Sequence, residues 1–202
     1  SRTLIPAFKR AGAHLTTLVT SGGISAIHHG KKNGFAMAST HVEDALGDDT
    51  DAVVIATQHN LHAEQTIQAL ERGKHVFVEK PLALTLAEVA KIEAVQETAG
   101  TVLMVGYNRR FAPQIQKIKS LLDKKAMPKT FIMTMNAGEI PKDHWTQDAE
   151  IGGGRIIGEA CHYIDLCSYL AESKVVSVCM NAMGKNPAED TDNATILLKY
   201  MN

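Results

Sequence analysis

The sequence lacks the features that mark secreted, membrane-spanning and nucleic-acid-binding proteins. Its three cysteines are an odd number without metal-ligand spacing, which argues against a disulfide framework and favours a reduced, cytoplasmic protein. No apolar run approaches the roughly 20 residues that cross a bilayer, and no signal-peptide pattern opens the chain. The formal net charge of −1 means that the chain has no excess positive charge to attract nucleic acid or an anionic membrane.

The first half instead alternates strand and helix patterns. Apolar runs typical of strands occupy residues 15–20, 35–38, 52–56, 76–78 and 102–105. Helical patterns occupy residues 4–11, 24–33, 41–46, 63–70 and 86–99, the last after a capping box formed by Thr85 and Glu88. This alternation predicts an α/β fold with a doubly wound parallel sheet, in which the continuous run 52–56 is buried on both faces.

A dinucleotide-binding sheet would begin with a strand and a G-x-G-x-x-G turn, and the sequence contains neither. Residues 1–3 resemble the tail of that turn. In the usual strand order the absent strand is central, so strands 15–20 and 52–56 would lack a common neighbour and keep unpaired apolar edges. We therefore expect the chain to be part of a longer protein, cut at both ends.

The 15–20 strand ends at Ser21, which two glycines follow, without the acid that binds an adenosine ribose in NAD-specific folds. The turn leaves room for a 2′-phosphate within reach of Lys31 or Lys32. The more ordinary interpretation is that both lysines are solvent-exposed residues of a helix. We predict that Ser21 contacts the cofactor, and the choice between NAD and NADP stays open.

Residues 76–82 place an acid, a base and a proline directly after an apolar strand. Ligands of open α/β sheets bind beyond the carboxyl ends of the strands, where Lys80 stands. Pro81 fixes the backbone, and a Lys-Pro bond can be cis at modest cost. An exposed ion pair between Glu79 and Lys80 at an ordinary strand end is the competing interpretation.

The second half changes to a period of two. After a helical pattern over 115–122, apolar residues alternate over 131–135, 174–181 and 193–200, which predicts a mainly antiparallel sheet.

A glycine run at 152–154 precedes a helix in which Gly158, His162 and Asp165 share one face. Asp165, one turn after His162, can orient the imidazole ring, although an isolated helix histidine is more often structural. Glu159 points about 100° away from Gly158 in a regular α-helix.

Three stretches, in this order, resemble motifs of the glucose–fructose oxidoreductase, inositol dehydrogenase and rhizopine-catabolism (Gfo/Idh/MocA) family of NAD(P)-dependent oxidoreductases. Segment 73–83 resembles its Glu-Lys-Pro signature, 106–111 its Gly-x-x-x-Arg-Phe domain junction, and 152–165 its stretch with the catalytic histidine. The resemblance implies a Rossmann-like domain without its first strand over 1–108 and an α+β domain over 109–202.

The resemblance also implies site roles. The expected catalytic residues are Lys80 and His162. The expected cofactor contacts are Ser21, Thr57, His62, Glu79, Lys80, Pro81 and Asn108, although Gln58 replaces a proline of the family's Thr-Pro-x-x-x-His element. The expected substrate contacts are Arg110, Trp145 and Asp165. The family's common catalytic aspartate falls on Gly158, so either the base function rests on His162 and Lys80 or the substrate class differs.

Local alternatives remain at several of these positions. His59 and His62 are three apart, but no third metal ligand is near in sequence, so a helix N-cap at Asn60 explains the segment better than a metal site. Arg110 would equally suit an interdomain ion pair. Trp145, the only tryptophan, could stack on a sugar ring or anchor domain packing.

Together these features predict hydride transfer between NAD(P) and a hydroxyl carbon of a sugar, sugar nucleotide or cyclitol, with no metal and no nucleic-acid or membrane partner. One alternative is an NAD-dependent redox-neutral glycosidase, and another is a dinucleotide-binding regulatory module without turnover. The resemblance further implies a homo-oligomer formed through the antiparallel sheet.

Overall fold

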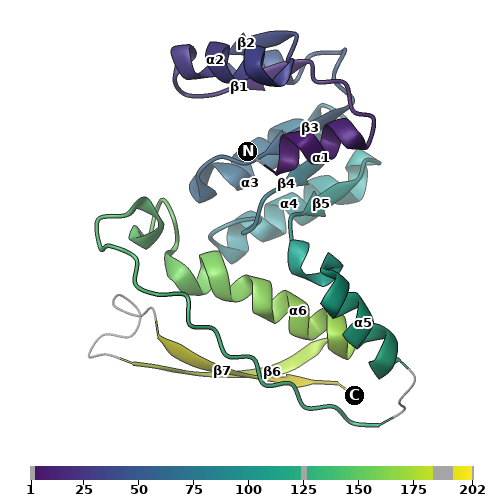
Figure 1. Cartoon of the computed structure of the whole chain (residues 1–202), viewed down its shortest axis with the longest axis vertical. Coiled ribbons are helices and arrows are strands. Elements are labelled where there is room, and N and C mark those ends of the chain that lie inside the picture. Colours follow the sequence, from purple (N-terminus) through teal and green to yellow (C-terminus); the bar gives the residue numbers. More distant parts are fainter. Residues whose placement is uncertain (1–2, 124–126, 184–192, 202) are drawn as a thin grey trace.

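The computed structural model describes residues 3–123, 127–183 and 193–201 (Figure 1). The first half contains α1 (Leu4–Arg10), β1 (Thr17–Val19), α2 (Gly23–Asn33), β2 (Met37–Ser39), the 3₁₀ turn η1 (Val42–Ala45), β3 (Ala52–Ile55), α3 (His59–Glu71), β4 (His75–Val78), α4 (Leu86–Ala99) and β5 (Leu103–Val105). The second half contains η2 (Asn108–Phe111), α5 (Pro113–Leu122), η3 (Trp145–Gln147), the π-helical turn η4 (Ile156–Ala160), α6 (Cys161–Ala171), β6 (Val175–Ala182) and β7 (Ala194–Tyr200). No helix within these ranges is long and apolar enough to cross a bilayer.

Local sequence signals set several of the helix ends. The backbone N–H of Glu88 donates to Thr85 Oγ1 at 3.2 Å, and the Glu88 carboxylate accepts from the backbone N–H of Thr85 at 2.9 Å, so the predicted capping box at the start of α4 is confirmed. Gly34 and Gly100 end α2 and α4 in the left-handed conformation, with φ of 77° and 65°.

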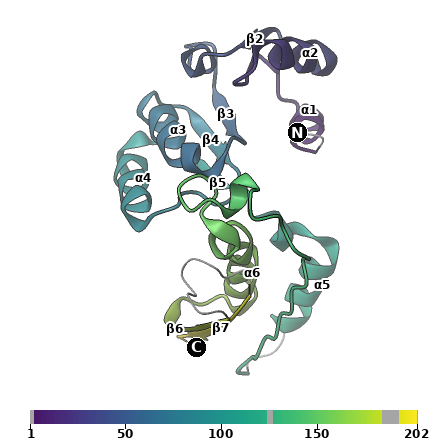
Figure 2. The same cartoon turned by 90° about the vertical axis from the view of Figure 1, so that its left-hand side faces the viewer.

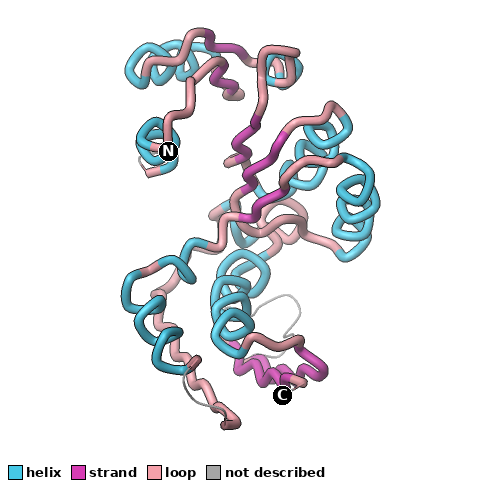
Figure 3. The backbone as a smooth tube through the Cα atoms, turned by 90° about the vertical axis from the view of Figure 1, so that its right-hand side faces the viewer, coloured by secondary structure: helices cyan, strands magenta, loops and turns pink. Residues whose placement is uncertain are grey.

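The parallel strands form two separate sheets (Figure 3). One is the pair β1–β2, and the other has the order β3-β4-β5. Among the residues that the structure describes, no strand lies between β1 and β3. The prediction that these two strands lack a common neighbour is therefore confirmed, and their facing edges are unpaired.

The main core lies between the β3-β4-β5 sheet and the helices α3 and α4 (Figure 2). Its buried members are Leu46, Ile55, Ala63, Ala69, Leu70, Val76, Val78 and Ile92. On the opposite face, α1 contacts the sheet through Phe8, whose ring lies edge-on to Phe77 at 5.5 Å. Val54 on that face is 43% exposed, so the prediction that 52–56 is buried on both faces is wrong, because the contact with α1 leaves Val54 open to solvent.

The second half is built around α6, which packs beside the antiparallel pair β6–β7. The hydroxyls of Ser168 on α6 and Tyr200 on β7 lie 3.2 Å apart. The predicted strand over 131–135 is wrong, because β6 and β7 pair with each other and residues 127–140 have no strand partner. Instead, Met133 contacts α6, with its Sδ 3.6 Å from Cys167 Sγ.

Leu70 tests the core directly, because its side chain is 1% exposed and belongs to the main cluster. We expect Leu70→Ala to lower the free energy of unfolding by about 2–5 kcal/mol, through lost apolar burial and the cavity left behind. Leu86→Ala is the matched control, since Leu86 is 88% exposed, and we expect a change within about 0.5 kcal/mol. Urea unfolding of both variants checks this, and equal losses would contradict the assigned core.

Candidate active site

The carboxyl ends of β3, β4 and β5 meet at one edge of the sheet, as they must in a parallel arrangement. Thr57, Lys80 and Tyr107 follow these ends. The turn η4 and the start of α6, from the second half of the chain, lie over the same edge (Figure 1). The two predicted catalytic residues, Lys80 and His162, therefore come from opposite sides of one region.

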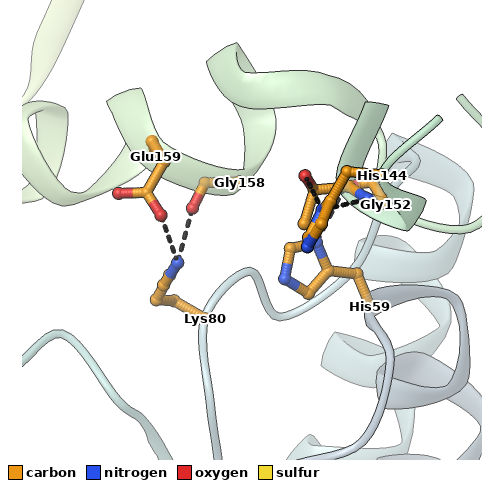
Figure 4. A network of polar contacts seen from close by, with 7 residues as sticks. His59, Lys80, His144, Gly152, Gly158 and Glu159 are labelled. Atoms are coloured by element: carbon orange, nitrogen blue, oxygen red, sulfur yellow. Dashed lines mark hydrogen bonds and ion pairs between the residues drawn. The ribbon is translucent and has the colours of Figure 1, made fainter. Parts of the chain in front are cut away.

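Lys80 joins the two halves of the chain (Figure 4). Its Nζ donates to the carbonyl oxygen of Gly158 at 2.7 Å and to Oε1 of Glu159 at 3.2 Å. Its side chain is 16% exposed, and the peptide bond to Pro81 is cis. An ammonium group has three N–H donors. Two have acceptors among the described residues, which leaves one for a ligand.

Glu159 is a site residue that the sequence interpretation missed. Residues Ile156–Ala160 form a π-helical turn rather than the regular α-helix that the spacing predicted. The carboxylate reaches Lys80 from this turn, with 37% of the side chain exposed. The only sequence signal for it was an acid directly next to the glycine that replaces the family's aspartate.

His162 is buried, at 7% exposure, and its Nδ1 has no hydrogen-bond partner among the described residues. Burial, followed by the positive charges of Lys80 and Arg109, lowers the pKa of His162, against the weaker opposing effect of nearby carboxylates. The ring is therefore neutral at pH 7 and can accept a proton. The ring of Tyr107 lies edge-on to it, with centroids 6.2 Å apart.

The helical spacing suggested that Asp165 orients His162, but in the structure Asp165 binds Arg110 instead. Both of its carboxylate oxygens accept from Arg110, through Nε at 3.1 Å and through a shorter contact with Nη2. The Arg110 guanidinium also lies over the ring of Tyr169, 5.3 Å from its centroid. Arg110 thus forms an ion pair, but its partner lies on α6 in the same predicted domain, so this is not the interdomain pair that was the alternative, and substrate binding by Arg110 and Asp165 stays a prediction.

His59 fills the space beside Gly158. Its Nδ1 lies 2.8 Å from the carbonyl oxygen of Gly152, so this nitrogen carries the proton and donates (Figure 4). The ring packs edge-on against Trp145, with centroids 4.8 Å apart. Trp145 therefore has a packing partner, and its stacking on a sugar stays a prediction.

The N-terminus of α3 lies two residues earlier than the sequence suggested. The helix begins at His59 with Gln58 as N-cap, so the predicted N-cap at Asn60 is wrong. The backbone N–H of Asn60 instead donates to the carbonyl oxygen of Ile151 at 3.0 Å, because the glycine segment docks on the first turn of α3.

His62 forms hydrogen bonds to two of the other predicted cofactor contacts, Pro81 and Thr57. Its Nδ1 lies 2.7 Å from the carbonyl oxygen of Pro81, and its Nε2 lies 3.2 Å from that of Thr57. The ring is 1% exposed. His62 therefore links the loop after β4 to the end of β3.

The remaining predicted cofactor contacts lie at three different places. Glu79 sits directly before Lys80, and a Cβ at Gly106, the residue after β5, would come within 3.1 Å of its carboxylate, so a side chain there would crowd Glu79. Asn108 is exposed at the start of η2. Ser21 is exposed after β1, in the other parallel sheet, and has no hydrogen bond to another predicted site residue in the described chain.

Two further groups beside His162 keep their protons at neutral pH. Burial raises the pKa of the Cys161 thiol to about 11 and that of the Tyr107 phenol to about 12. Neither is a ready nucleophile. Within the described ranges, no three His, Cys, Asp or Glu side chains are grouped to hold a metal ion.

Comparisons with known proteins match both halves of the chain. Residues 2–107 match the description "Oxidoreductase family, NAD-binding Rossmann fold", and residues 115–202 match the "GFO/IDH/MocA C-terminal domain".

A 1-carboxy-3-chloro-3,4-dihydroxycyclohexa-1,5-diene dehydrogenase of Comamonas testosteroni is 33% identical over 159 residues, which are 76% of this chain and 40% of that protein. A 1,5-anhydro-D-fructose reductase of Ensifer adhaerens is 28% identical over 93% of this chain and 59% of its own length. The solved structure of levoglucosan dehydrogenase with NADH and levoglucosan superposes with a TM-score of 0.79 at 25% identity, over 92% of this chain and 54% of that chain. The chain thus spans about half the length of these relatives.

The two buried histidines predict how stability depends on pH. Burial is the largest cause that lowers the pKa of both His59 and His162 below 6.5. Just below that pH the unfolded chain binds more protons than the folded chain, so the free energy of unfolding falls as the pH drops from about 7 toward 5. We expect His162→Asn to reduce this slope. Urea unfolding across this range measures it, and an unchanged slope would contradict the assignment.

The glycine segment gives a second, independent prediction. A Cβ at Gly152 would lie 2.3 Å from Thr146 Cα, a backbone atom that cannot move aside alone, whereas a Cβ at Gly154 meets nothing within 4 Å. Gly154 has φ of 73°, so Gly154→Ala should cost about 1–2 kcal/mol of stability through backbone strain. We expect Gly152→Ala to cost clearly more, because it also displaces the loop from His59. Similar melting temperatures for the two variants would refute this.

Proposed function

The chain belongs to the Gfo/Idh/MocA family of NAD-binding oxidoreductases, and from this premise we propose that its site transfers a hydride between NAD(P) and a hydroxyl carbon of a sugar, sugar nucleotide or cyclitol. The observation that carries the proposal is that Lys80, which retains one N–H donor, lies near enough to act electrostatically on His162, a buried neutral histidine whose Nδ1 is unpartnered among the described residues. A hydrogen-bond donor and a proton acceptor at one place suit oxidation of an alcohol.

The residues at this edge fit a nicotinamide cofactor. Buried polar atoms in proteins nearly always have partners, so the unpartnered Nδ1 of His162 and Nε of Arg109 favour a polar ligand at this position. The site also lies beyond the carboxyl ends of three parallel strands, where open α/β sheets bind ligands. We propose that Thr57, Pro81 and Glu79 hold the nicotinamide end, with Ser21 at the adenosine end and Asn108 at the domain junction.

In the proposed reaction the bound cofactor accepts or returns the hydride. Lys80 donates its remaining N–H to the oxygen of the reacting hydroxyl, which stabilises negative charge that develops on that oxygen. His162 accepts the hydroxyl proton as a general base, which its lowered pKa allows at pH 7. In the reverse direction the protonated imidazole returns the proton to the carbonyl oxygen. The phenol of Tyr107 stays protonated beside this ring.

The substrate class rests on relatives and on the residues around the site. Relatives named for an anhydrosugar ketone, a cyclic diol and levoglucosan all handle small hydroxylated rings. We propose the same class for this chain, with Trp145 and the Arg110–Asp165 pair lining the substrate side.

We also propose that the protein forms a homo-oligomer through the antiparallel sheet. Val178, Met180 and Leu197 on β6 and β7 are 64%, 49% and 69% exposed. A sheet with this much exposed apolar surface is typical of an interface. The cytoplasmic location that the cysteine content favours stays a prediction.

Lys80 provides the test of the proposed reaction. We expect the full-length protein to bind NADH or NADPH saturably, measured by nicotinamide fluorescence, and to reduce NAD(P) with at least one of levoglucosan, 1,5-anhydro-D-glucitol and myo-inositol. Lys80→Ala should lower kcat by about 10²–10⁴-fold, because the developing alkoxide loses its donor, with little change in NADH affinity.

Lys91→Ala is the control, since Lys91 lies exposed on α4, and its turnover should equal that of wild type. Wild-type turnover in Lys80→Ala would overturn the assignment of Lys80. Release of a free sugar without net NADH would point to the redox-neutral glycosidase reaction instead.

A further inference from the structure

We infer that Glu159 is the positioning residue that fixes the Lys80 ammonium for catalysis, in the role that a carboxylate at position 158 cannot fill in this chain. The inference rests on the proposed function of Lys80. It assigns a role to a residue that neither the helical spacing nor the family resemblance singled out.

The first support is the geometry of the ammonium group. A lysine side chain has four rotatable bonds, so one hydrogen bond leaves its end group free to rotate. In this chain the Gly158 carbonyl and the Glu159 carboxylate hold Nζ from two directions, at 2.7 and 3.2 Å. Two fixed donors determine the direction of the third, so Glu159 aims the N–H that is left for the substrate hydroxyl.

The second support is the backbone that carries Glu159. π-Helical turns are rare, occur mostly as single turns and are frequent at functional sites. The turn Ile156–Ala160 presents both acceptors of Lys80, one from the main chain and one from a side chain. The segment thus builds one binding site for a single ammonium group from consecutive residues.

The third support is the space around Gly158. A Cβ at this position would lie 3.2 Å from Cε1 of His59. His59 cannot easily move away, since Gly152 binds its Nδ1 and Trp145 packs against its ring. A carboxylate at 158 is therefore disfavoured here, and the neighbouring residue supplies one from the other side.

The fourth support is that the other carboxylate of this segment is already occupied. Asp165 accepts from Arg110 with both oxygens and is only 10% exposed. It belongs to the contact between η2 and α6 rather than to Lys80. Of the two acids between residues 156 and 171, only Glu159 pairs with the lysine.

The test compares Glu159→Gln and Glu159→Ala with wild type, using the polyol of the panel above that wild type oxidises fastest. We expect Glu159→Gln to lower kcat by about 10–100-fold, because a misdirected donor is costly in the transition state. KM and the dissociation constant for NADH should change by less than about threefold, since Glu159 contacts neither ligand in the proposal.

Formate supplies a readout that a merely structural role would not move. Glu159 is 37% exposed, so a small carboxylate can enter the space that Glu159→Ala opens. Formate should restore part of kcat in Glu159→Ala in a saturable manner, whereas Glu159→Gln, whose amide fills the space, should not respond.

Glu172→Gln is the matched control, because Glu172 also pairs with a lysine, Lys119, at 2.6 Å, but far from the site. Its kcat should equal that of wild type. A kcat in Glu159→Gln within about twofold of wild type, or no formate response in a folded Glu159→Ala, would overturn the positioning role. Wild-type protein that binds NADH but oxidises no polyol would instead overturn the proposed function itself.

Discussion

The site depends on the hydrogen bond between the ammonium group of Lys80 and the carbonyl oxygen of Gly158, which lies 78 positions further along the chain. Lys80 is placed by the parallel sheet, at the end of β4, and its acceptors are placed by η4 in the second half. Neither half alone defines where the ammonium points. The hydrogen bonds of Lys80 therefore connect the folding of the two halves to the formation of the site.

A second constraint comes from the electrostatic surroundings of the buried imidazole. His162 lies close enough to two cations, Lys80 and Arg109, for both to disfavour a third positive charge. Arg109 is itself held over the ring of Tyr163, 4.5 Å from its centroid. A neutral base near a cationic donor suits the proposed alcohol oxidation, and burial and charge both keep the imidazole neutral.

Sequence patterns predicted the elements whose causes are local. The capping box at Thr85 and the alternation of strands with helices in the first half both follow from neighbouring residues. The patterns failed where distant partners decide. The alternating residues 131–135 have no neighbouring strand to pair with in the described chain. Asp165 binds Arg110, 55 positions away, rather than His162 on its own helix. The spacing of apolar residues did not predict the π-helical turn.

The separation of the two parallel sheets has a consequence for cooperativity. The β1–β2 pair and α2 bury few residues, Ala26 and Gly30 in the helix among them, whereas β3-β4-β5 shares a continuous core with α3 and α4. Regions with thin cores open at lower free energy than the global transition. Amide protons of β1 and β2 should therefore exchange with solvent through local opening, while those of β4 exchange only when the whole α/β unit unfolds. We therefore expect the part of the chain around Ser21 to open at a lower free energy than the part around Lys80.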